Sequence, residues 1–177
     1  MVGNKIYFAG GTAGYYTSLN ALKTIDIFDG ATNIWSTSSL QEPKFSMASI
    51  SFGNKIFWAG GYSAAGLNTG FTVSNQVEIK DLNTGTSSFA CSIPRSRFEA
   101  VIKEDNIVFF TGNYTNNPLS GTHFEIYNTK SNTWSTGVLN RRINDATIIS
   151  VNNTIYVAGG REQPWGPYFN QVYKLEF

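Results

Sequence analysis

The side chains that most often perform catalysis are scarce in this sequence. It contains one histidine, His123, and one cysteine, Cys91. A lone imidazole leaves a zinc site without its second histidine, and a lone cysteine excludes an internal disulfide and a thiolate-rich metal centre. We interpret His123 as structural, at the start of an expected strand, and Cys91 as a small packed hydrophobe on or after an outer strand. No catalytic residue, metal ligand or cofactor is therefore predicted.

Three acidic residues recur at matching points of the sequence, Asp26, Glu78 and Glu125. A catalytic pair needs its two carboxyl groups a few ångströms apart, and residues one repeat apart do not meet in that way. We interpret the three acids as positions that face solvent or that link neighbouring repeats.

Cations and aromatic residues give more support to binding. Basic residues gather where each expected repeat opens, and aromatic residues are frequent in the segments that follow each glycine pair. Guanidinium groups bind carboxylates, while Tyr and Trp supply contact area at low entropic cost. Some of these arginines, Arg95 and Arg141 above all, have a structural alternative, in which they bond backbone carbonyls and tie repeats together. The predicted ligand- or partner-binding residues are Tyr62, Arg95, Arg97, Tyr114, Arg141, Arg142, Arg161, Trp165 and Tyr168.

The composition narrows the class of protein. The 177 residues carry a net charge of +1, which argues against a nucleic-acid-binding protein and a polybasic membrane anchor. No apolar run approaches the roughly 18 residues of a membrane span, and the first residues do not resemble a signal peptide. Hydrophobic residues make up 41% and aromatic residues 15%, against only 14% charged residues. Together with many Gly and Asn residues, this favours strands and turns over helices.

One nine-residue pattern occurs four times, with spacings of 50, 52 and 47 residues. Each copy starts with a small or polar pair that suits a tight turn, continues as a short apolar strand and closes on glycine. The third copy closes on Gly112-Asn113 instead of a glycine pair. The copies cover residues 3–11, 53–61, 105–113 and 152–160.

Further strands complete the unit around each copy. Alternation of apolar and polar residues predicts strands at 25–29, 77–81, 124–128 and 172–176, and a tryptophan follows two of them, Trp35 and Trp134. In the second repeat Ser87 stands at the tryptophan position, with Phe89 on the same strand face. Opening strands are expected over 44–52, 95–103 and 142–151. One unit therefore consists of four short strands in about 50 residues, which indicates an all-β repeat fold.

These motifs resemble the kelch-repeat family. The resemblance rests on Gly10-Gly11, Phe28-Asp29 and Trp35 in the first repeat, and on Tyr127-Asn128 and Trp134 in the third. It implies a kelch-type β-propeller of four-stranded antiparallel blades, with blades near 1–40, 41–92, 93–138 and 139–177. It also implies that the segments after each glycine pair and the starts of the innermost strands share one face of the propeller.

The expected strand numbers are three, four, four and three, so the first and last blades are incomplete. Kelch propellers usually close with six or seven blades, whereas this chain supplies about three and a half. Such an open arc would leave apolar blade faces bare, so we expect further blades or a second copy of the chain to complete the ring.

Kelch blades serve many functions, so the resemblance predicts no specific partner. Our first hypothesis is non-catalytic recognition of a protein or peptide, for which the cations favour an acidic one. The second is a carbohydrate-binding or cell-surface module that stacks sugars on Tyr62, Tyr114, Trp165 and Tyr168. The third is the remnant of a galactose-oxidase-like copper enzyme, which the single histidine argues against.

Overall fold

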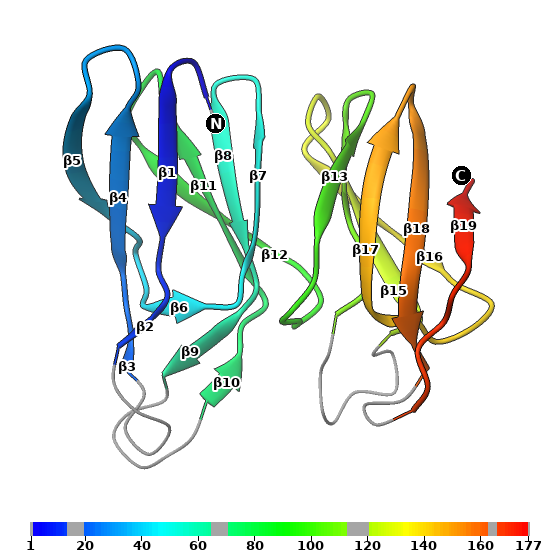
Figure 1. Ribbon diagram of the computed structural model, residues 1–177. Coiled ribbons are helices and arrows are strands. Elements are labelled where there is room, and N and C mark those ends of the chain that lie inside the picture. Colours follow the sequence, from blue (N-terminus) through cyan, green and yellow to red (C-terminus); the bar gives the residue numbers. More distant parts are fainter. Residues whose placement is uncertain (1, 14–19, 65–70, 113–120, 163–165, 177) are drawn as a thin grey trace. The chain divides into compact units, whose positions relative to one another are not determined.

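The computed structural model describes residues 2–13, 20–64, 71–112, 121–162 and 166–176 (Figure 1). Within these residues the chain is all-β and contains no helix, and every strand pairing is antiparallel. The chain divides into two compact units, residues 1–92 and 93–177. Each unit contains two larger sheets.

The first unit contains a three-stranded and a four-stranded sheet. In the first sheet β1 (Lys5–Ala9) and β5 (Ile34–Ser39) flank β4 (Thr24–Asp29). The second sheet has the order β12-β11-β8-β7, with β7 (Ala48–Phe52), β8 (Lys55–Ala59), β11 (Gln76–Asp81) and β12 (Ser87–Cys91).

Five short strands form two smaller sheets in the same unit. One pairs β2 (Thr12–Ala13) with β3 (Asn20–Ala21), and the other has the order β10-β9-β6, with β6 (Lys44–Phe45), β9 (Tyr62–Ala64) and β10 (Phe71–Val73). These strands lie at the end of the unit away from the turn between β7 and β8 (Figure 1).

The second unit also contains a four-stranded and a three-stranded sheet, in the opposite order along the chain. Its four-stranded sheet follows chain order, with β13 (Ala100–Lys103), β14 (Asn106–Phe109), β15 (His123–Asn128) and β16 (Thr133–Val138). Its three-stranded sheet contains β17 (Asn144–Val151), β18 (Thr154–Arg161) and β19 (Val172–Leu175). The larger sheets thus have three, four, four and three strands, as the sequence predicts.

The sheets share one strand register. Phe8 lies opposite Asp26, and Trp58 lies opposite Glu78. Phe109 lies opposite Glu125, so it matches Phe8 and Trp58. This register corrects the alignment of the third copy of the nine-residue pattern by one residue. That copy starts at Glu104, and Thr111-Gly112 occupies the position of the glycine pair, rather than Gly112-Asn113.

A second correction concerns the opening strands, which begin later than expected. Ser46 and Arg97 have φ values of 54° and 52°, and this left-handed backbone interrupts the extended chain. Asp145, with a φ of 54°, lies inside β17, which continues across it. The expected strand over 44–52 is therefore divided into β6 and β7, which belong to different sheets. For the same reason β13 starts only at Ala100. In addition, β18 continues through its glycine pair to Arg161, where the pattern predicts an end.

Each unit has an apolar core between its two larger sheets. In the first unit Ile25 and Leu40 pack with Ile56 and Trp58, and in the second unit Val108 and Phe124 of one sheet pack with Ile155 and Val157 of the other. One face of every larger sheet is therefore buried against its neighbour, as the alternation of apolar and polar residues requires.

Candidate functional site

In each unit the opening segments of the sheets meet the segments that follow the glycine pairs. In the first unit Gly11 N–H donates to the Lys44 carbonyl at 2.9 Å, and Lys44 N–H donates to the Leu22 carbonyl at 3.0 Å. In the second unit Ile143 N–H donates to the Gly121 carbonyl at 2.7 Å, and Phe169 N–H donates to the Gly160 carbonyl at 2.7 Å. We call this part of each unit its loop end.

The loop end of the first unit carries a cluster of three aromatic rings. Phe45 stacks on the predicted residue Tyr62, with ring centroids 5.2 Å apart, and meets Phe71 edge-on at 4.8 Å. The rings stand on β6, β9 and β10, which pair with one another. Phe71 is 40% exposed, so the cluster offers a fixed apolar surface. Phe45 and Phe71 were not among the predicted site residues.

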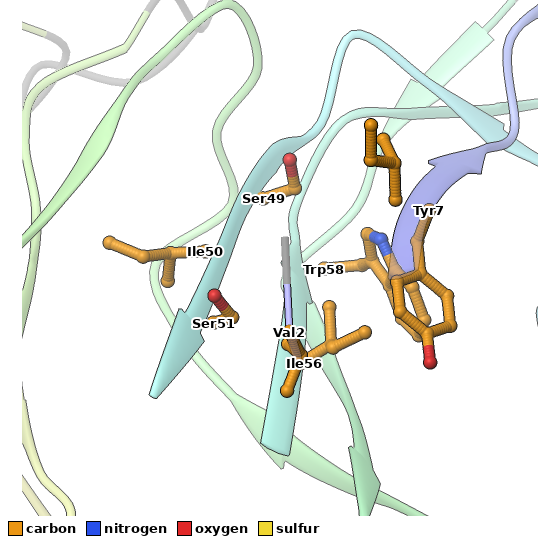
Figure 2. Close-up of a pocket in the computed structure, with 8 residues that line it drawn as sticks. Val2, Tyr7, Ser49, Ile50, Ser51, Ile56 and Trp58 are labelled. Carbon is orange, nitrogen blue, oxygen red and sulfur yellow. The ribbon is translucent and has the colours of Figure 1, made fainter. Parts of the chain in front are cut away.

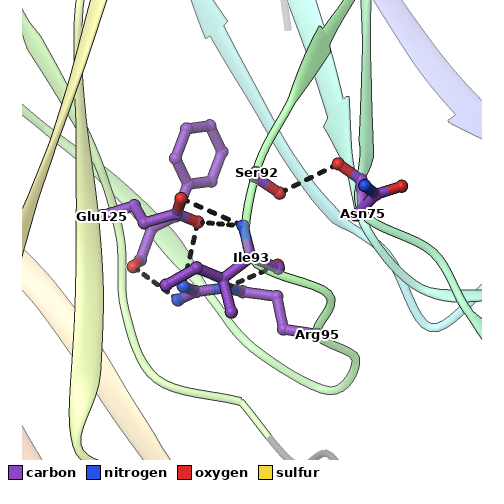
Figure 3. A network of polar contacts seen from close by, with 6 residues as sticks. Asn75, Ser92, Ile93, Arg95 and Glu125 are labelled. Atoms are coloured by element: carbon purple, nitrogen blue, oxygen red, sulfur yellow. Dashed lines mark hydrogen bonds and ion pairs between the residues drawn. The ribbon is translucent and has the colours of Figure 1, made fainter. Parts of the chain in front are cut away.

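Arg95 is a structural residue, which is the alternative that the sequence left open. Its side chain is buried, and Nη2 donates to Glu125 Oε2 at 2.9 Å while Nη1 donates to the Phe109 carbonyl at 3.0 Å (Figure 3). Both Glu125 carboxylate oxygens also accept from Ile93 N–H, at 2.9 and 3.0 Å. Burial raises the pKa of Glu125, and the Arg95 guanidinium and the Ile93 N–H oppose that rise.

Lys44 holds the equivalent position in the segment that precedes β7. It is 1% exposed, and its ammonium lies 3.4 Å from Gln76 Oε1 and 3.9 Å from Glu42 Oε2. Burial lowers the pKa of Lys44, an effect that the Glu42 and Glu78 charges oppose. Glu78 is buried too and accepts from Gln41 N–H at 3.0 Å. Glu78 and Glu125 each hold the segment that opens their own repeat, so these contacts do not link neighbouring repeats, whereas Asp26 is exposed.

Arg141 is half-buried, and its guanidinium group contacts two aromatic residues. Its guanidinium carbon lies 3.9 Å from the centre of the Phe169 ring, and Nη1 donates to the Tyr173 hydroxyl at 2.9 Å. Tyr173 takes the register position that Glu125 has in the preceding sheet. This arginine therefore joins two segments of the second unit instead of projecting into solvent.

Arg161 supports an exposed tyrosine. Its guanidinium forms an ion pair with Asp145, with Nη2 and Nε lying 2.5 and 2.7 Å from Oδ2. The same guanidinium lies 5.3 Å from the centre of the Tyr168 ring, and the two backbones form a β-bridge. Tyr168 is 71% exposed. Asp145, at a positive-φ position of β17, was not predicted from the sequence.

The other predicted residues differ in their surroundings. Arg97 is exposed and makes no hydrogen bond or ion pair with the described residues. Arg142 is half-buried and has a partner. Tyr114 and Trp165 lie outside the described residues. The structure therefore brings Arg161 and Tyr168 together, and it places Arg95 in the interior.

The residues with catalytic potential form no cluster with one another in the described part of the chain. His123 is the first residue of β15, and its Nδ1 lies 2.8 Å from the Thr122 hydroxyl. Cys91 is the last residue of β12. Within the described ranges no three His, Cys, Asp or Glu residues come together as metal ligands. The same ranges contain no helix with the length and apolar character that crossing a membrane requires.

Neither a family model nor a curated protein matches the chain.

Proposed function

We propose that the chain is a run of kelch-type β-propeller blades that acts as a non-catalytic recognition module and binds a protein or peptide at its loop ends. The four larger sheets support this proposal because they repeat one strand register and one hairpin turn whose first residue has a positive φ, at Gly3, Gly53, Glu104 and Asn152. Two of the sheets also share a buried cation beside an acidic residue. A repeated scaffold of this kind positions side chains on its connecting segments, where binding residues concentrate.

The observation that carries the function is the Tyr168 ring, which is 71% exposed but fixed from below by Arg161 and Asp145. A tyrosine held in one position loses little entropy when a partner covers it. The Phe45, Tyr62 and Phe71 cluster gives the first unit a comparable surface.

The charge preference of the partner rests on fewer residues than the sequence suggests. Arg95, Arg141 and Arg161 already have carboxylate, hydroxyl or aromatic partners within the chain. Arg97 is exposed and has no ion pair with the described residues, so it is the cation that we assign to an acidic group of the partner. The partner is accordingly a peptide with an apolar or aromatic residue and one acidic residue.

A display selection tests this function. The immobilised chain is panned with a random peptide library, and the selected peptides are then titrated into the parent chain and into a folded Tyr168→Ala, Tyr62→Ala variant. The same two proteins are applied to a glycan array. Peptides that bind the parent chain and lose at least about tenfold in affinity on the variant support the proposal. Glycan binding without peptide binding favours the carbohydrate module instead, for which Tyr168 offers a stacking ring. Selected peptides that bind both proteins equally contradict a loop-end site.

A further inference from the structure

Lys44 carries its ammonium group into the interior of the first unit. The side chain is 1% exposed, and Nζ donates to Gln76 Oε1 at 3.4 Å. Its ion pair is with Glu42, at 3.9 Å, whereas the Glu78 charge acts on it from beyond ion-pair distance. A buried ammonium with such weak compensation is costly, and burial accordingly lowers the pKa of Lys44. The interior therefore shifts Lys44 toward the neutral amine, which is a nucleophile.

The Glu78 carboxylate keeps one oxygen free in the same interior. Oε2 accepts from Gln41 N–H at 3.0 Å, whereas Oε1 is buried and has no hydrogen-bond partner among the described residues. Gln76 and Glu78 are two positions apart in β11, so their side chains lie on the same face of the strand. Glu78 Oε1 is therefore an unused proton acceptor on the face that carries the Lys44–Gln76 contact.

The third sheet fills the matching positions differently. Glu125 has the register of Glu78, and Arg95 Nη2 donates directly to Glu125 Oε2 at 2.9 Å. Lys44 forms no such contact with its own acid and meets the Gln76 amide instead. A guanidinium stays charged and does not attack an amide, whereas an amine does. The second sheet thus combines an amine, an amide and a free carboxylate oxygen where the third sheet has a closed ion pair.

The surroundings of Glu78 restrict the access of water. Trp58 lies opposite Glu78 in the strand pairing, is 2% exposed and belongs to the apolar core of the unit. Figure 2 shows the Trp58 side chain pointing toward Tyr7, where both line the hollow beside β1. Lys44 and Glu78 are not among the described residues that line this hollow. An amide bond formed between buried groups at this place is therefore protected from hydrolysis.

We propose that Lys44 and Gln76 form an intramolecular isopeptide bond, with Glu78 as the group that carries the protons. The 3.4 Å contact places the amine within reach of the amide, and rotation about the last side-chain torsion of Gln76 turns its Cδ toward Nζ. The bond fastens β6 to β11, which belong to different sheets. This modification is independent of the loop-end recognition proposed above.

The atoms and protons of this reaction balance without another reagent. Glu78 takes a proton from the Lys44 ammonium, and the free amine attacks Cδ of Gln76, so that a C–N bond forms as the carbonyl electron pair moves to oxygen. The adduct collapses and expels the amide nitrogen, which takes one proton from the attacking nitrogen and leaves as ammonia. Glu78 then gives its proton to the ammonia, and ammonium is released. Gln76 is half-buried, so this product can leave to solvent.

Mass spectrometry of the intact, denatured chain tests the bond. Release of ammonia lowers the mass by about 17 Da relative to the sequence, whereas condensation of Lys44 with the Glu42 carboxylate would release water and lower it by about 18 Da. We expect the loss of about 17 Da in the purified chain after prolonged incubation at neutral pH. Trypsin should then fail to cleave after Lys44, and residues 24–55 should remain joined to residues 56–80.

Two variants separate the reaction from a structural role. Lys44→Arg reproduces the arginine–glutamate pair of the third sheet but cannot form the amide, so its mass should equal the calculated value. Glu78→Gln removes the proton carrier and should slow the reaction at least about tenfold. Circular dichroism verifies the fold of both variants. The proposal is overturned if the folded parent chain keeps its full mass, if the loss is about 18 Da, if Lys44→Arg shows the same loss as the parent, or if folded Glu78→Gln reacts as fast as the parent.

Discussion

The buried Glu125 carboxylate allows a quantitative test of how the segment that opens the third sheet is held against that sheet. It accepts two contacts from Ile93 N–H and one from Arg95, all between 2.9 and 3.0 Å, and Arg95 is only 3% exposed. Glu125→Gln removes the charge while keeping the shape, so the Arg95 guanidinium remains buried without a counterion. Breaking a buried pair in this way costs about 3–5 kcal/mol, a large part of the roughly 5–15 kcal/mol that stabilises a typical domain.

Urea unfolding, followed by tryptophan fluorescence and far-ultraviolet circular dichroism, measures this loss. With an m value of about 1–3 kcal/mol/M, the midpoint should fall by at least about 1 M. Asp26→Asn is the matched control, since the same register position is exposed and unpaired in the first sheet, and it should change stability by no more than about 0.5 kcal/mol. A Glu125→Gln shift as small as that of Asp26→Asn would refute the reasoning. So would full additivity of Glu125→Gln with Arg95→Met, because residues in direct contact should couple.

Three further variants test the turns, the core and the alkaline limit of the fold. Burial raises the pKa of the Tyr127 hydroxyl, so the protonated hydroxyl stabilises the fold fully at neutral pH, and this stabilisation is lost as pH rises above about 10. Tyr127→Phe should therefore reduce the fall in urea midpoint that the parent chain shows above that pH. Gly61→Ala should lower the free energy of unfolding by about 1–3 kcal/mol or more, because the Gly61 φ is +87° and the new Cβ would lie 2.5 Å from the Phe45 carbonyl oxygen. Gly53→Asn, in a turn with open space around it, should change the thermal stability little. Ile155→Ala, at a fully buried position, should cost about 2–5 kcal/mol by urea unfolding, and a loss below about 1 kcal/mol would contradict the core described for the second unit.

The sequence predicts the strands well because their signals are local. Glycine pairs, Gly-Asn turns and alternation of apolar residues locate β1, β4 and β8 within a residue or two. The trio Phe8, Phe28 and Trp35 is a product of the same period. Phe28 lies opposite Trp35, Phe8 lies diagonal to both on the same sheet face, and the rings of Phe8 and Phe28 both contact Trp35. Phe109, Tyr127 and Trp134 repeat this arrangement in the third sheet.

The backbone at Ser46, Arg97 and Asp145 is beyond local prediction. Ser46 and Arg97 are not residue types that favour positive φ, so their backbone depends on the packing of the segment against its own sheet. Asp145 is a type that tolerates positive φ, but its ion pair with Arg161 comes from a strand 16 positions away. The one-residue shift of the third repeat has a related cause. Strand pairing of Phe109 with Glu125 determines that register, and matching by residue type cannot detect it.

The predicted site residues separate according to long-range contacts. Arg95 and Arg161 look alike in the sequence, but one faces a buried glutamate 30 positions away and the other faces Asp145 at the surface. Charge alone therefore overstates the number of cations available to a partner. Among the predicted residues that the structure describes, Tyr168 and Arg97 are the exposed ones.

The central claim is that this chain recognises its partner through fixed side chains at the loop ends. The most direct measurement is calorimetric titration of a selected peptide into the parent chain and into the folded Tyr168→Ala variant, with Tyr156→Ala as the control for loss of an unrelated exposed tyrosine. The account predicts at least about tenfold weaker binding for Tyr168→Ala and unchanged binding for Tyr156→Ala. Equal affinity in all three proteins would contradict it.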